Sequence, residues 1–458
     1  MFQRKVYQKL MIWKEKYASK RPYGEWLDSN LVMLKDLKIP NQRVEEYSKE
    51  ERAKLQNEYT SYIKIDFANT TEEILDIFSN TAKSDLLFLR LQTETGIKLI
   101  EGESAIIFDQ IQCNSKARNI AKDLVKDGRY HYIETADFLY SNRKFEEASE
   151  YKIKMYPMDY EEFLWAVGSD SNVFHDICRL DEKMGNLINR KLMRDFRLYM
   201  AVGGMPQAVK TYIATNNFDD VDRVKRQIIK LYLEDLNRMD KSGKLAKIYK
   251  AIPVQLALKK KHFIFYTAIG KPKTEKDERK LAELWDSNIV LACYHLKTPD
   301  ITAIPRYESD KFRLYMADTG LLVTMLFDKS MGSQPDIYNK LLNDKLDADL
   351  GFLYENAVAQ MLTACENKLY YHTWKKRNSS HFYEIDFLVT LQEKIIPIEV
   401  KASAVNNERS ILAFTEKYSM CAGKQYLFSQ NDVSRKENLE LKPIYMLPFL
   451  FAEDSKMT

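Results

Sequence analysis

Glycine and cysteine are both scarce in this sequence. Its 458 residues include only 14 glycines and five cysteines, and the cysteines form no CxxC pair: Cys113, Cys178, Cys293, Cys365 and Cys421. Such dispersed cysteines argue against a disulfide framework or a zinc knuckle and fit a reducing compartment. The six histidines show no metal-ligand spacing either, so we assign them no function.

Long hydrophobic runs are absent as well. The opening segment MFQRKVYQKLMIWKEKY instead spaces four apolar side chains along one face of a helix, between cations: Phe2, Val6, Leu10 and Trp13. It lacks the continuous apolar stretch of a signal peptide, and no other segment approaches the length that spans a bilayer. We therefore expect a cytoplasmic protein with no membrane partner.

Neither sign of charge is in large excess. The chain carries 70 Lys and Arg against 66 Asp and Glu, a net charge of +4. This balance does not by itself indicate a nucleic-acid-binding protein, although single domains can still have basic faces. The chain is too long for one ordinary core, and we expect roughly two to four domains.

The first third of the chain alternates strand and helix patterns. Strands are expected at 61–67, 104–112, 130–136 and 151–159, and helices at 72–78, 84–96 and 115–128. Strands separated by helices of this size predict right-handed crossovers and a parallel sheet. The fold class is therefore α/β, and residues 1–160 form its first domain.

The remainder divides by pattern into three further parts. Residues 161–243 are helical throughout, and residues 244–330 are helical with a closing hairpin. Residues 340–458 return to mixed α/β, because a helix over 350–366 precedes strands such as YEIDFLVT and KIIPIEVKAS.

Six motifs occur in an order that is typical of one family: IIFDQIQ, MYPMDYEEFLWAVG, LYMAVGGMPQAV, RLYMADTGLL, GFLYENAVAQML and EIDFLV…IPIEVKAS. They resemble a bacterial and archaeal family of AAA-superfamily ATPases whose C-terminal domain, of unassigned function, is similar to restriction endonucleases. The resemblance covers the chain from about residue 60 onward, together with the N-terminal helix. It implies a P-loop, AAA-like parallel sheet with a helical lid, a winged-helix middle domain and a C-terminal PD-(D/E)xK nuclease-like domain, and it leaves a homo-oligomer open.

The phosphate-binding loop that the resemblance implies is missing. A P-loop needs G-x-x-x-x-G-K-[ST], so that backbone N–H groups wrap the phosphates. Where the family has it, LVMLKDLKIPNQR (31–43) carries no glycine and has Pro40, which lacks an N–H donor. Lys35 and Lys38 remain as weak anion-binding candidates. A rearranged stretch of a once-working gene is an alternative explanation of residues 20–58, which the sequence does not decide.

Two further departures point the same way. Asp109 ends the strand AIIFD as a magnesium-binding aspartate would, but Gln110 replaces the carboxylate that polarises water in an ATPase, and an amide is a poor base. In YIETADF, Ala136 and Asp137 stand where the family has small polar residues beside the γ-phosphate, and a carboxylate there would repel phosphate. The alternatives are a lost ATPase site and an ordinary strand whose Asp109 caps a helix.

The motif LYMAVGGMPQAV contains a helix end. Gly203 and Gly204 permit a sharp reversal, and Pro206 can begin the next helix in its first turn. A structural role is favoured over contact with a nucleotide.

The C-terminal part contains a set of charged residues that suits metal-dependent phosphodiester chemistry. Glu399 and Lys401 are two apart on a strand and share a face, and Asp386 lies on the preceding hairpin strand. Two carboxylates, Asp386 and Glu399, can hold Mg²⁺, which activates water, while a lysine orients it. Glu355 matches an additional carboxylate of the family.

Two basic segments with interleaved aromatic residues, ALKKKHF (257–263) and HTWKKRNSSHFYE (372–384), resemble phosphate-tracking surfaces, although solvated charge is the simpler interpretation. Two hypotheses follow. The first is a DNA-acting protein that binds and cleaves DNA with Mg²⁺ and uses its ATPase-like part as a scaffold. The second is an assembly or regulatory protein that is inert at both sites. Residual ATP binding through a non-standard loop is a third.

Overall fold

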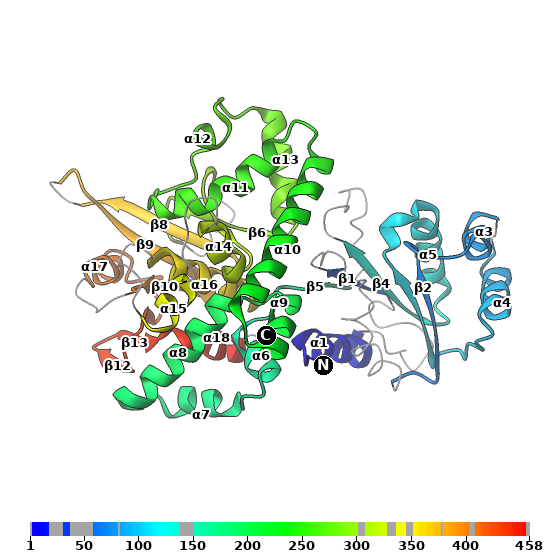
Figure 1. Ribbon diagram of the computed structural model, residues 1–458, viewed down its shortest axis with the longest axis horizontal. Helices are drawn as coiled ribbons and strands as arrows, with labels where there is room; N and C mark the ends of the chain where they lie inside the picture. The colour runs from blue at the N-terminus through cyan, green and yellow to red at the C-terminus, as the bar shows by residue number, and fades with distance from the viewer. Residues whose placement is uncertain are drawn as a thin grey trace. The chain divides into compact units, whose positions relative to one another are not determined.

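A computed structural model describes residues 2–17, 31–36, 58–80, 83–137, 151–300, 307–327, 336–344, 351–376, 379–391, 393–402 and 408–454. The chain divides into two compact units, Met1–Tyr156 and Pro157–Thr458, and each is considered by itself. Both are mixtures of helix and strand, as the α/β prediction requires (Figure 1). Within the described ranges, every helix is too short or too polar to cross a bilayer.

Unit 1 is built on a five-stranded sheet in the order β2-β3-β4-β1-β5, and every neighbouring pair is parallel. Its elements are α1 (Lys5–Ile12), the π-helical turn η1 (Trp13–Tyr17), β1 (Leu31–Asp36), β2 (Ser61–Asp66), α3 (Glu72–Asn80), α4 (Ser84–Thr95), β3 (Ser104–Asp109), the 3-10 turn η2 (Ile111–Cys113), α5 (Ser115–Asp127), β4 (His131–Asp137) and β5 (Tyr151–Lys154). The predicted parallel sheet is confirmed.

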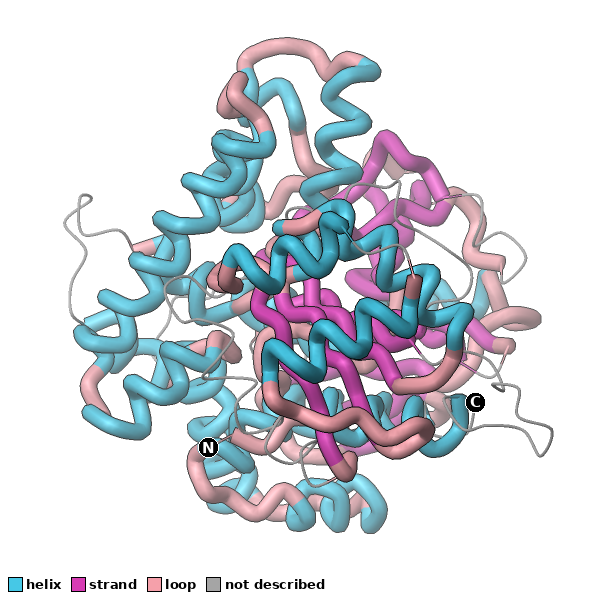
Figure 2. The backbone as a smooth tube through the Cα atoms, turned by 90° about the vertical axis from the view of Figure 1, so that its right-hand side faces the viewer, coloured by secondary structure: helices cyan, strands magenta, loops and turns pink. Residues whose placement is uncertain are grey.

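Both faces of this sheet are covered, which explains why β3 is apolar along its whole length. Ile106 and Phe108 pack against α3, α4 and α5 on one face, and Figure 2 shows helices lying across the strands. Ala105 and Ile107 pack against α1 and Trp13 on the other face. A parallel strand that is buried on both sides reads as a continuous hydrophobic run. The amphipathic N-terminal helix predicted from the sequence therefore packs its apolar face on the sheet.

The winding of unit 1 reverses at β1. The chain leaves β1 for β2 at the far edge of the sheet, and then returns through β3 and β4 to β5 on the other side of β1. In an open parallel sheet, ligands bind outside the carboxyl ends of the strands where the winding reverses. The carboxyl ends of β1 and its neighbours are therefore the place in unit 1 to look for a ligand site.

Unit 2 begins with a run of helices: α6 (Tyr160–Ala166), α7 (Asn172–Leu180), α8 (Asn186–Val202), α9 (Pro206–Thr215), α10 (Phe218–Met239), α11 (Lys244–Ala257), α12 (Phe265–Ile269) and α13 (Glu275–Asp286). A hairpin of β6 (Val290–Leu296) and β7 (Tyr307–Met316) follows, and then α14 (Thr319–Leu326) and α15 (Asp336–Leu342). The predicted helical stretch and its closing hairpin are thus present.

The last part of unit 2 returns to α/β structure: α16 (Gly351–Ala364), β8 (Leu369–Lys375), β9 (Phe382–Leu391), β10 (Lys394–Val400), α17 (Arg409–Lys417), β11 (Gln425–Ser429), β12 (Ser434–Lys436), β13 (Leu439–Pro443), a 3-10 turn η8 (Ile444–Met446) and α18 (Leu447–Asp454). These strands form one mixed sheet with the earlier hairpin, in the order β12-β13-β11-β10-β9-β8-β6-β7. Because β6 pairs with β8, a single sheet joins residues that we predicted to lie in separate domains.

The end of α8, at Gly203 and Gly204, packs closely against the start of α14. The Gly204 N–H donates to Asp318 Oδ2 at 2.6 Å, and a Cβ on Gly320 would lie 2.6 Å from backbone atoms of Gly203. Gly203 has φ +87°, a value that side chains rarely permit, and Pro206 occupies the first turn of α9. The predicted reversal and helix start are confirmed, and both glycines are explained by backbone packing.

A buried lysine lies under the same junction. Lys225 Nζ donates to the carbonyl oxygens of Ala201 at 2.7 Å and Gly320 at 3.2 Å. Burial lowers the pKa of Lys225 to about 8, against the opposing charges of Asp222 and Asp318. This amine therefore satisfies carbonyls at the end of α8 and ties α10 to the junction.

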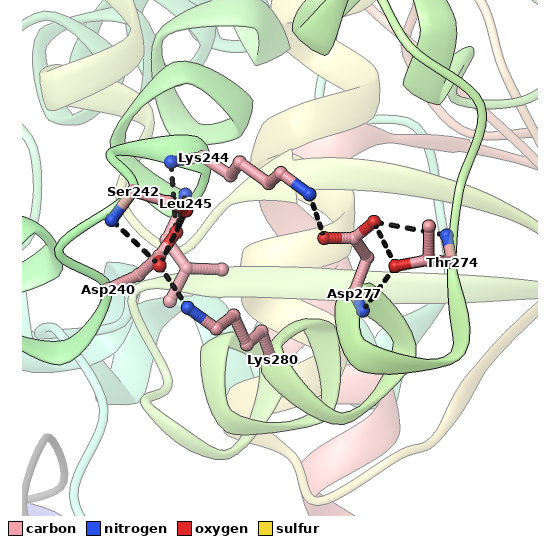
Figure 3. A network of polar contacts seen from close by, with 7 residues as sticks. All are labelled: Asp240, Ser242, Lys244, Leu245, Thr274, Asp277 and Lys280. Atoms are coloured by element: carbon pink, nitrogen blue, oxygen red, sulfur yellow. Dashed lines mark hydrogen bonds and ion pairs between the residues drawn. The ribbon is translucent and has the colours of Figure 1, made fainter.

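Charged side chains join the ends of α10, α11 and α13 (Figure 3). Asp240 accepts hydrogen bonds from Ser242 and Lys244 and pairs with Lys280, and Lys244 Nζ lies 2.6 Å from an oxygen of Asp277. Thr274 and Asp277 form a capping box at the start of α13. Burial raises the pKa of Asp240, but the bonds from Lys280 and Ser242 outweigh it and hold that pKa at about 2. The network fixes three helices ahead of the hairpin.

The junction of α8 with α14 generates a stability prediction. Gly320→Ala places a methyl group against the Gly203 backbone, which cannot move without breaking the Gly204–Asp318 bond. We expect the free energy of unfolding of unit 2 to fall by about 2 kcal/mol, as overpacking usually costs. Urea unfolding followed by circular dichroism measures this. Gly351→Ala is the control, because its Cβ would meet only Ala402 at 3.5 Å, and equal midpoints for the two variants would contradict the prediction.

Candidate functional site

The structure places Asp109 among partners from two neighbouring strands. The carboxylate is buried at the end of β3, where Oδ1 accepts a hydrogen bond from Thr135 Oγ1 at 2.5 Å. Its Oδ2 lies 3.1 Å from Nζ of Lys64, which comes from β2. The Gln110 N–H donates to the same Thr135 hydroxyl at 3.1 Å, and Gln110 itself is left-handed with φ 53°. A lysine of the chain thus balances the charge of Asp109.

The alternative role that we considered for Asp109, a helix cap, is wrong. The cap of α5 is Asn114, whose Oδ1 accepts hydrogen bonds from the N–H groups of Lys116 and Ala117 at 3.1 and 3.0 Å. Asn114 is a good cap because its short side chain reaches the unpaired N–H groups of the first turn. Asp109 therefore contacts residues of the neighbouring strands, and Asn114 caps the helix α5.

The other residues predicted near a nucleotide are only partly within the described chain. The backbone of Lys35 lies in β1, paired between Ala136 of β4 and Lys154 of β5. The side chains of Lys35, Ala136 and Asp137, and the whole of Lys38, lie outside the described residues. So does most of the segment 20–58. Of the predicted nucleotide site, the structure describes the side chains of Asp109 and Gln110.

The charged residues predicted in the C-terminal part come together at the middle of the large sheet. Asp386 lies on β9 and Glu399 on β10. Lys401 directly follows the last residue of β10, and Glu355 lies on α16. Glu399 Oε2 lies 2.8 Å from Lys401 Nζ. Asp386 Oδ2 accepts a hydrogen bond from the Val400 N–H at 2.9 Å. The i, i+2 spacing and the hairpin thus bring Asp386, Glu399 and Lys401 to one site, as the sequence predicted.

An irregularity in β9 helps to aim Asp386. The pairing of β8 with β9 shifts between Tyr370 and His372, where Tyr370 faces Leu388 but His372 faces Ile385. Bulges of this kind are common beside active sites because they redirect a side chain. Ile385 and Leu388 both pack in the core beneath α17, so the extra residue of the bulge lies between them, at Asp386 and Phe387.

Two buried amides hold α16, and with it Glu355, against the sheet. Asn356 Oδ1 accepts a hydrogen bond from the Met316 N–H at 2.8 Å, and Gln360 Oε1 accepts from the Thr319 N–H at 2.8 Å. Buried polar groups of this kind need such partners. The motif LYENAVAQ therefore supplies a charged residue, Glu355, together with the amides that orient its helix.

The carboxylates of this site influence one another. Burial and the negative charge of Asp386 raise the pKa of Glu355 to about 7, although Arg313 opposes them. The same two causes raise the pKa of Glu399 to about 7, against Lys401. Burial also raises the pKa of Asp386 itself, against the charge of Lys401. Carboxyl groups that share a low-dielectric site and have raised pKa values are a frequent property of functional sites.

Sequence reasoning missed a second cation at this site, Arg313 of β7. Its guanidinium is buried, pairs with Glu384 of β9 and lies 4.4 Å from the ring centroid of Tyr371. Its Nε donates to the carbonyl oxygen of Lys261 at 3.0 Å. Burial lowers the pKa of Arg313, but Tyr315 and the carboxylates of Glu384, Glu355 and Asp386 outweigh it and raise that pKa. The motif RLYMADTGLL contains this arginine, but nothing local in the sequence indicates its partners.

The oxygen donors predicted for a metal at this site are the two carboxylates of Asp386 and Glu399, too few for a closed protein cage. Among the described residues, no group of three or more His, Cys, Asp and Glu side chains is arranged to hold a metal ion. Mg²⁺ is usually bound by one or two carboxylates and keeps several waters. The contacts above use one oxygen of Asp386 and one of Glu399. A pair of carboxylates beside a lysine therefore fits the predicted cofactor in kind.

Comparison with known proteins places two matches on unit 2. Residues 193–331 match a domain of unknown function (DUF8612), and residues 350–447 match a second domain of unknown function (DUF4143), which contains all four predicted site residues. No curated protein matches the chain closely enough to count as a relative.

Two solved structures align over most of the chain. Protein VC1899 from Vibrio cholerae aligns over 94% of this chain and 93% of its own, with 12% identity and a TM-score of 0.19. Can2 from Sulfobacillus thermosulfidooxidans, solved in complex with cyclic tetra-adenylate, aligns over 85% of this chain and 97% of its own, with 9% identity and a TM-score of 0.18. Scores of this size carry no argument about fold or function.

The raised pKa values predict how stability depends on pH. A carboxyl group with a higher pKa in the folded chain binds its proton more tightly there, so its contribution to stability falls as pH rises from about 4.5 to about 7 and then stays constant. Glu355→Gln removes one such group. We expect this variant to be more stable than the parent chain at pH 8, by about 2 kcal/mol, and close to it at pH 4.5.

Urea unfolding at the two pH values measures this difference. Glu283→Gln is the matched control, because Glu283 is exposed on α13, and it should change stability equally at both pH values. An equal effect of Glu355→Gln at pH 4.5 and pH 8 would show that Glu355 is not held in a shared carboxylate site.

Proposed function

We propose that unit 2 acts on DNA through a nuclease-like site that uses Mg²⁺, and that unit 1 derives from an ATPase and now serves as a scaffold. The observation that carries the proposal is that Asp386, Glu399 and Lys401 come together at one site. Asp386 and Glu399 lie on the paired strands β9 and β10, and Lys401 follows the end of β10. The helix α16 adds the charge of Glu355. The order α16-β8-β9-β10-α17-β11 around that site supports a PD-(D/E)xK nuclease-like domain, and the match to a domain of unknown function supports the resemblance there.

Each residue of the site has a role in this proposal. Magnesium, held by Asp386 and Glu399, would supply an activated water. Lys401 holds its charge next to Glu399, where it can orient that water and stabilise negative charge on a phosphate. Arg313 adds a second positive charge on the same face. Phosphodiester hydrolysis needs this combination of carboxylates for the metal and cations for the phosphate.

The two basic segments predicted to track phosphates lie against each other. Lys261, from the segment ALKKKHF, has its Nζ 4.3 Å from the ring centroid of Phe382 on β9, and its carbonyl oxygen accepts a hydrogen bond from Arg313. The helices α11 and α13 precede the β6–β7 hairpin, and this order supports a winged-helix part, which can insert a helix into a DNA groove. These neighbours supply the positive surface that a DNA substrate would need beside the carboxylates.

One observation favours the second candidate, an inert assembly or regulatory protein. Both acidic sites contain cations of the chain itself: Lys64 beside Asp109, and Lys401 and Arg313 beside the carboxylates of unit 2. Internal cations can stabilise a site that no longer binds metal. The two candidates differ in whether metal-dependent cleavage occurs.

Metal-dependent cleavage of DNA tests the proposed nuclease site. The purified full-length protein with Mg²⁺ or Mn²⁺ is expected to nick plasmid DNA or shorten single-stranded DNA. Asp386→Ala should reduce the rate about a hundredfold or more, because a metal ligand matters at least as much as the groups that orient it. Glu283→Ala, an exposed change on α13, should leave the rate unchanged. Absence of cleavage and of DNA binding in the parent chain would support the inert alternative.

The effect of ATP on stability tests the proposed scaffold role of unit 1. Since a ligand that binds only the folded state raises its melting temperature in proportion to occupancy, millimolar Mg-ATP should leave the melting temperature of the protein unchanged. Differential scanning fluorimetry with and without Mg-ATP measures this, with Mg²⁺ alone as the control. A rise of several degrees that requires ATP would favour residual binding through the segment 31–43 and contradict a pure scaffold role for unit 1.

A further inference from the structure

A pocket of about 480 Å³ opens between the β8–β9 hairpin and α17. Its lining combines aromatic and charged side chains with one small residue: Trp374, Lys375, Tyr383, Ala413, Glu416 and Lys417. The volume is within the range of about 300–1,000 Å³ that small-molecule sites usually have. The hairpin extends well beyond the rest of the sheet, with α17 beside its base (Figure 1).

The pocket and the carboxylate site lie on opposite faces of the sheet. Ile385 packs with Phe414 of α17 in the core on the side of the pocket. Tyr383 of the pocket lining and Ile385 are two apart on β9, so Glu384 between them points to the other face of the sheet. Glu384 pairs with Arg313, and the charges of both act on Asp386, which places Asp386 on that other face. Glu355, which shares the site of Asp386, belongs to α16. A ligand in the pocket is therefore separate from the metal site, although one strand carries residues of both.

The aromatic wall of the pocket is held in place by the protein. Trp374 and Tyr383 are cross-strand partners with ring centroids 5.2 Å apart. On its own strand, Trp374 stacks on His372 with centroids 5.1 Å apart, and the edge of Phe414 meets it from α17. Lys376 Nζ lies 4.6 Å from the centroid of the Tyr383 ring. Lys376 thus lies over one face of the Tyr383 ring, beside the pocket.

The charges around the wall favour an anion beside an aromatic ligand. Lys375 and Lys417 line the pocket against a single carboxylate, Glu416, and Lys376 adds a third cation nearby. Lys417 Nζ lies 5.7 Å from the ring centroid of Trp374, so one cation stands at the edge of the aromatic wall. An aromatic platform with adjacent lysines is the arrangement that binds a base and its phosphate in single-stranded nucleic acids.

We propose that this pocket receives one unstacked base of single-stranded DNA, with the adjoining phosphate at Lys375 and Lys417. The inference rests on the proposed action on DNA and deepens it, because it names a strand anchor on the face opposite the carboxylates. A base within a duplex is stacked and paired and cannot enter a concave pocket. The anchor therefore selects single strands, frayed ends or gaps over continuous duplex.

Filling the pocket from α17 tests the proposal without removing a charge. Ala413→Phe places a ring where the base would lie. Leu412→Phe is the matched control, because Leu412 is 48% exposed on the same helix and is not part of the lining. Fluorescence anisotropy with a labelled oligo-dT, in EDTA so that no metal is bound, should show about tenfold weaker binding for Ala413→Phe and unchanged binding for Leu412→Phe.

Three further measurements identify the ligand. Lys417→Gln should weaken oligo-dT binding and reduce its dependence on salt, since one phosphate contact is lost. Free thymidine monophosphate at millimolar concentration should compete only weakly, and duplex DNA of the same length should not show the Ala413→Phe effect. Strong competition by the free nucleotide would instead mean a small-molecule site and overturn the strand-anchor proposal.

The outcomes separate this proposal from the nuclease proposal. If the protein does not cleave DNA but Ala413→Phe weakens its binding to oligo-dT, the strand-anchor proposal is supported and the catalytic site is rejected. If Asp386→Ala abolishes cleavage while Ala413→Phe and Leu412→Phe both bind oligo-dT like the parent chain, only the strand-anchor proposal is rejected. Circular dichroism of each variant confirms that the fold is intact.

Discussion

The hydrogen bond from the Val400 N–H to Asp386 is the contact on which the C-terminal site depends. It joins β10 to a carboxylate of β9 at the point where the antiparallel pairing ends, so that Asp386 lies beside Glu399. The bond also supplies a donor to a buried carboxylate that would otherwise be costly to desolvate. Lys401 then follows on the same face and balances part of the charge. Backbone pairing sets β9 and β10 side by side, and this bond holds the Asp386 side chain toward β10.

The two acidic sites of the chain differ in how far their charge is neutralised. In unit 1, Asp109 is buried and has both a lysine and a hydroxyl as partners, Lys64 and Thr135. In unit 2, the carboxylates retain raised pKa values despite the nearby cations, so ionising them carries a cost that comes mainly from burial and, for Glu355 and Glu399, also from the charge of Asp386. A divalent cation would offset that cost. We therefore place the proposed metal site at the carboxyl-terminal sheet and not at Asp109.

Local pattern predicted much of this architecture, and long-range pairing set its limit. The parallel sheet followed from alternating strands and helices, and the meeting of Asp386, Glu399 and Lys401 followed from strand spacing and one hairpin. The contact of Arg313 could not be predicted in the same way. Its partner, Glu384, is 71 residues later in the sequence, and β6 and β8 lie between their two strands in the sheet. The pairing of Lys64 with Asp109 likewise depends on β2 and β3 being neighbours, which no motif in either strand records.

The most direct test of the account is to ask which acidic site binds a divalent cation. Electron paramagnetic resonance of Mn²⁺ titrated into the full-length protein counts bound ions without requiring catalysis. The account predicts that Asp386→Asn removes bound Mn²⁺ and that Asp109→Asn leaves it unchanged, because Lys64 and Thr135 already occupy Asp109. Loss of bound Mn²⁺ on Asp109→Asn, with full binding retained in Asp386→Asn, would contradict it.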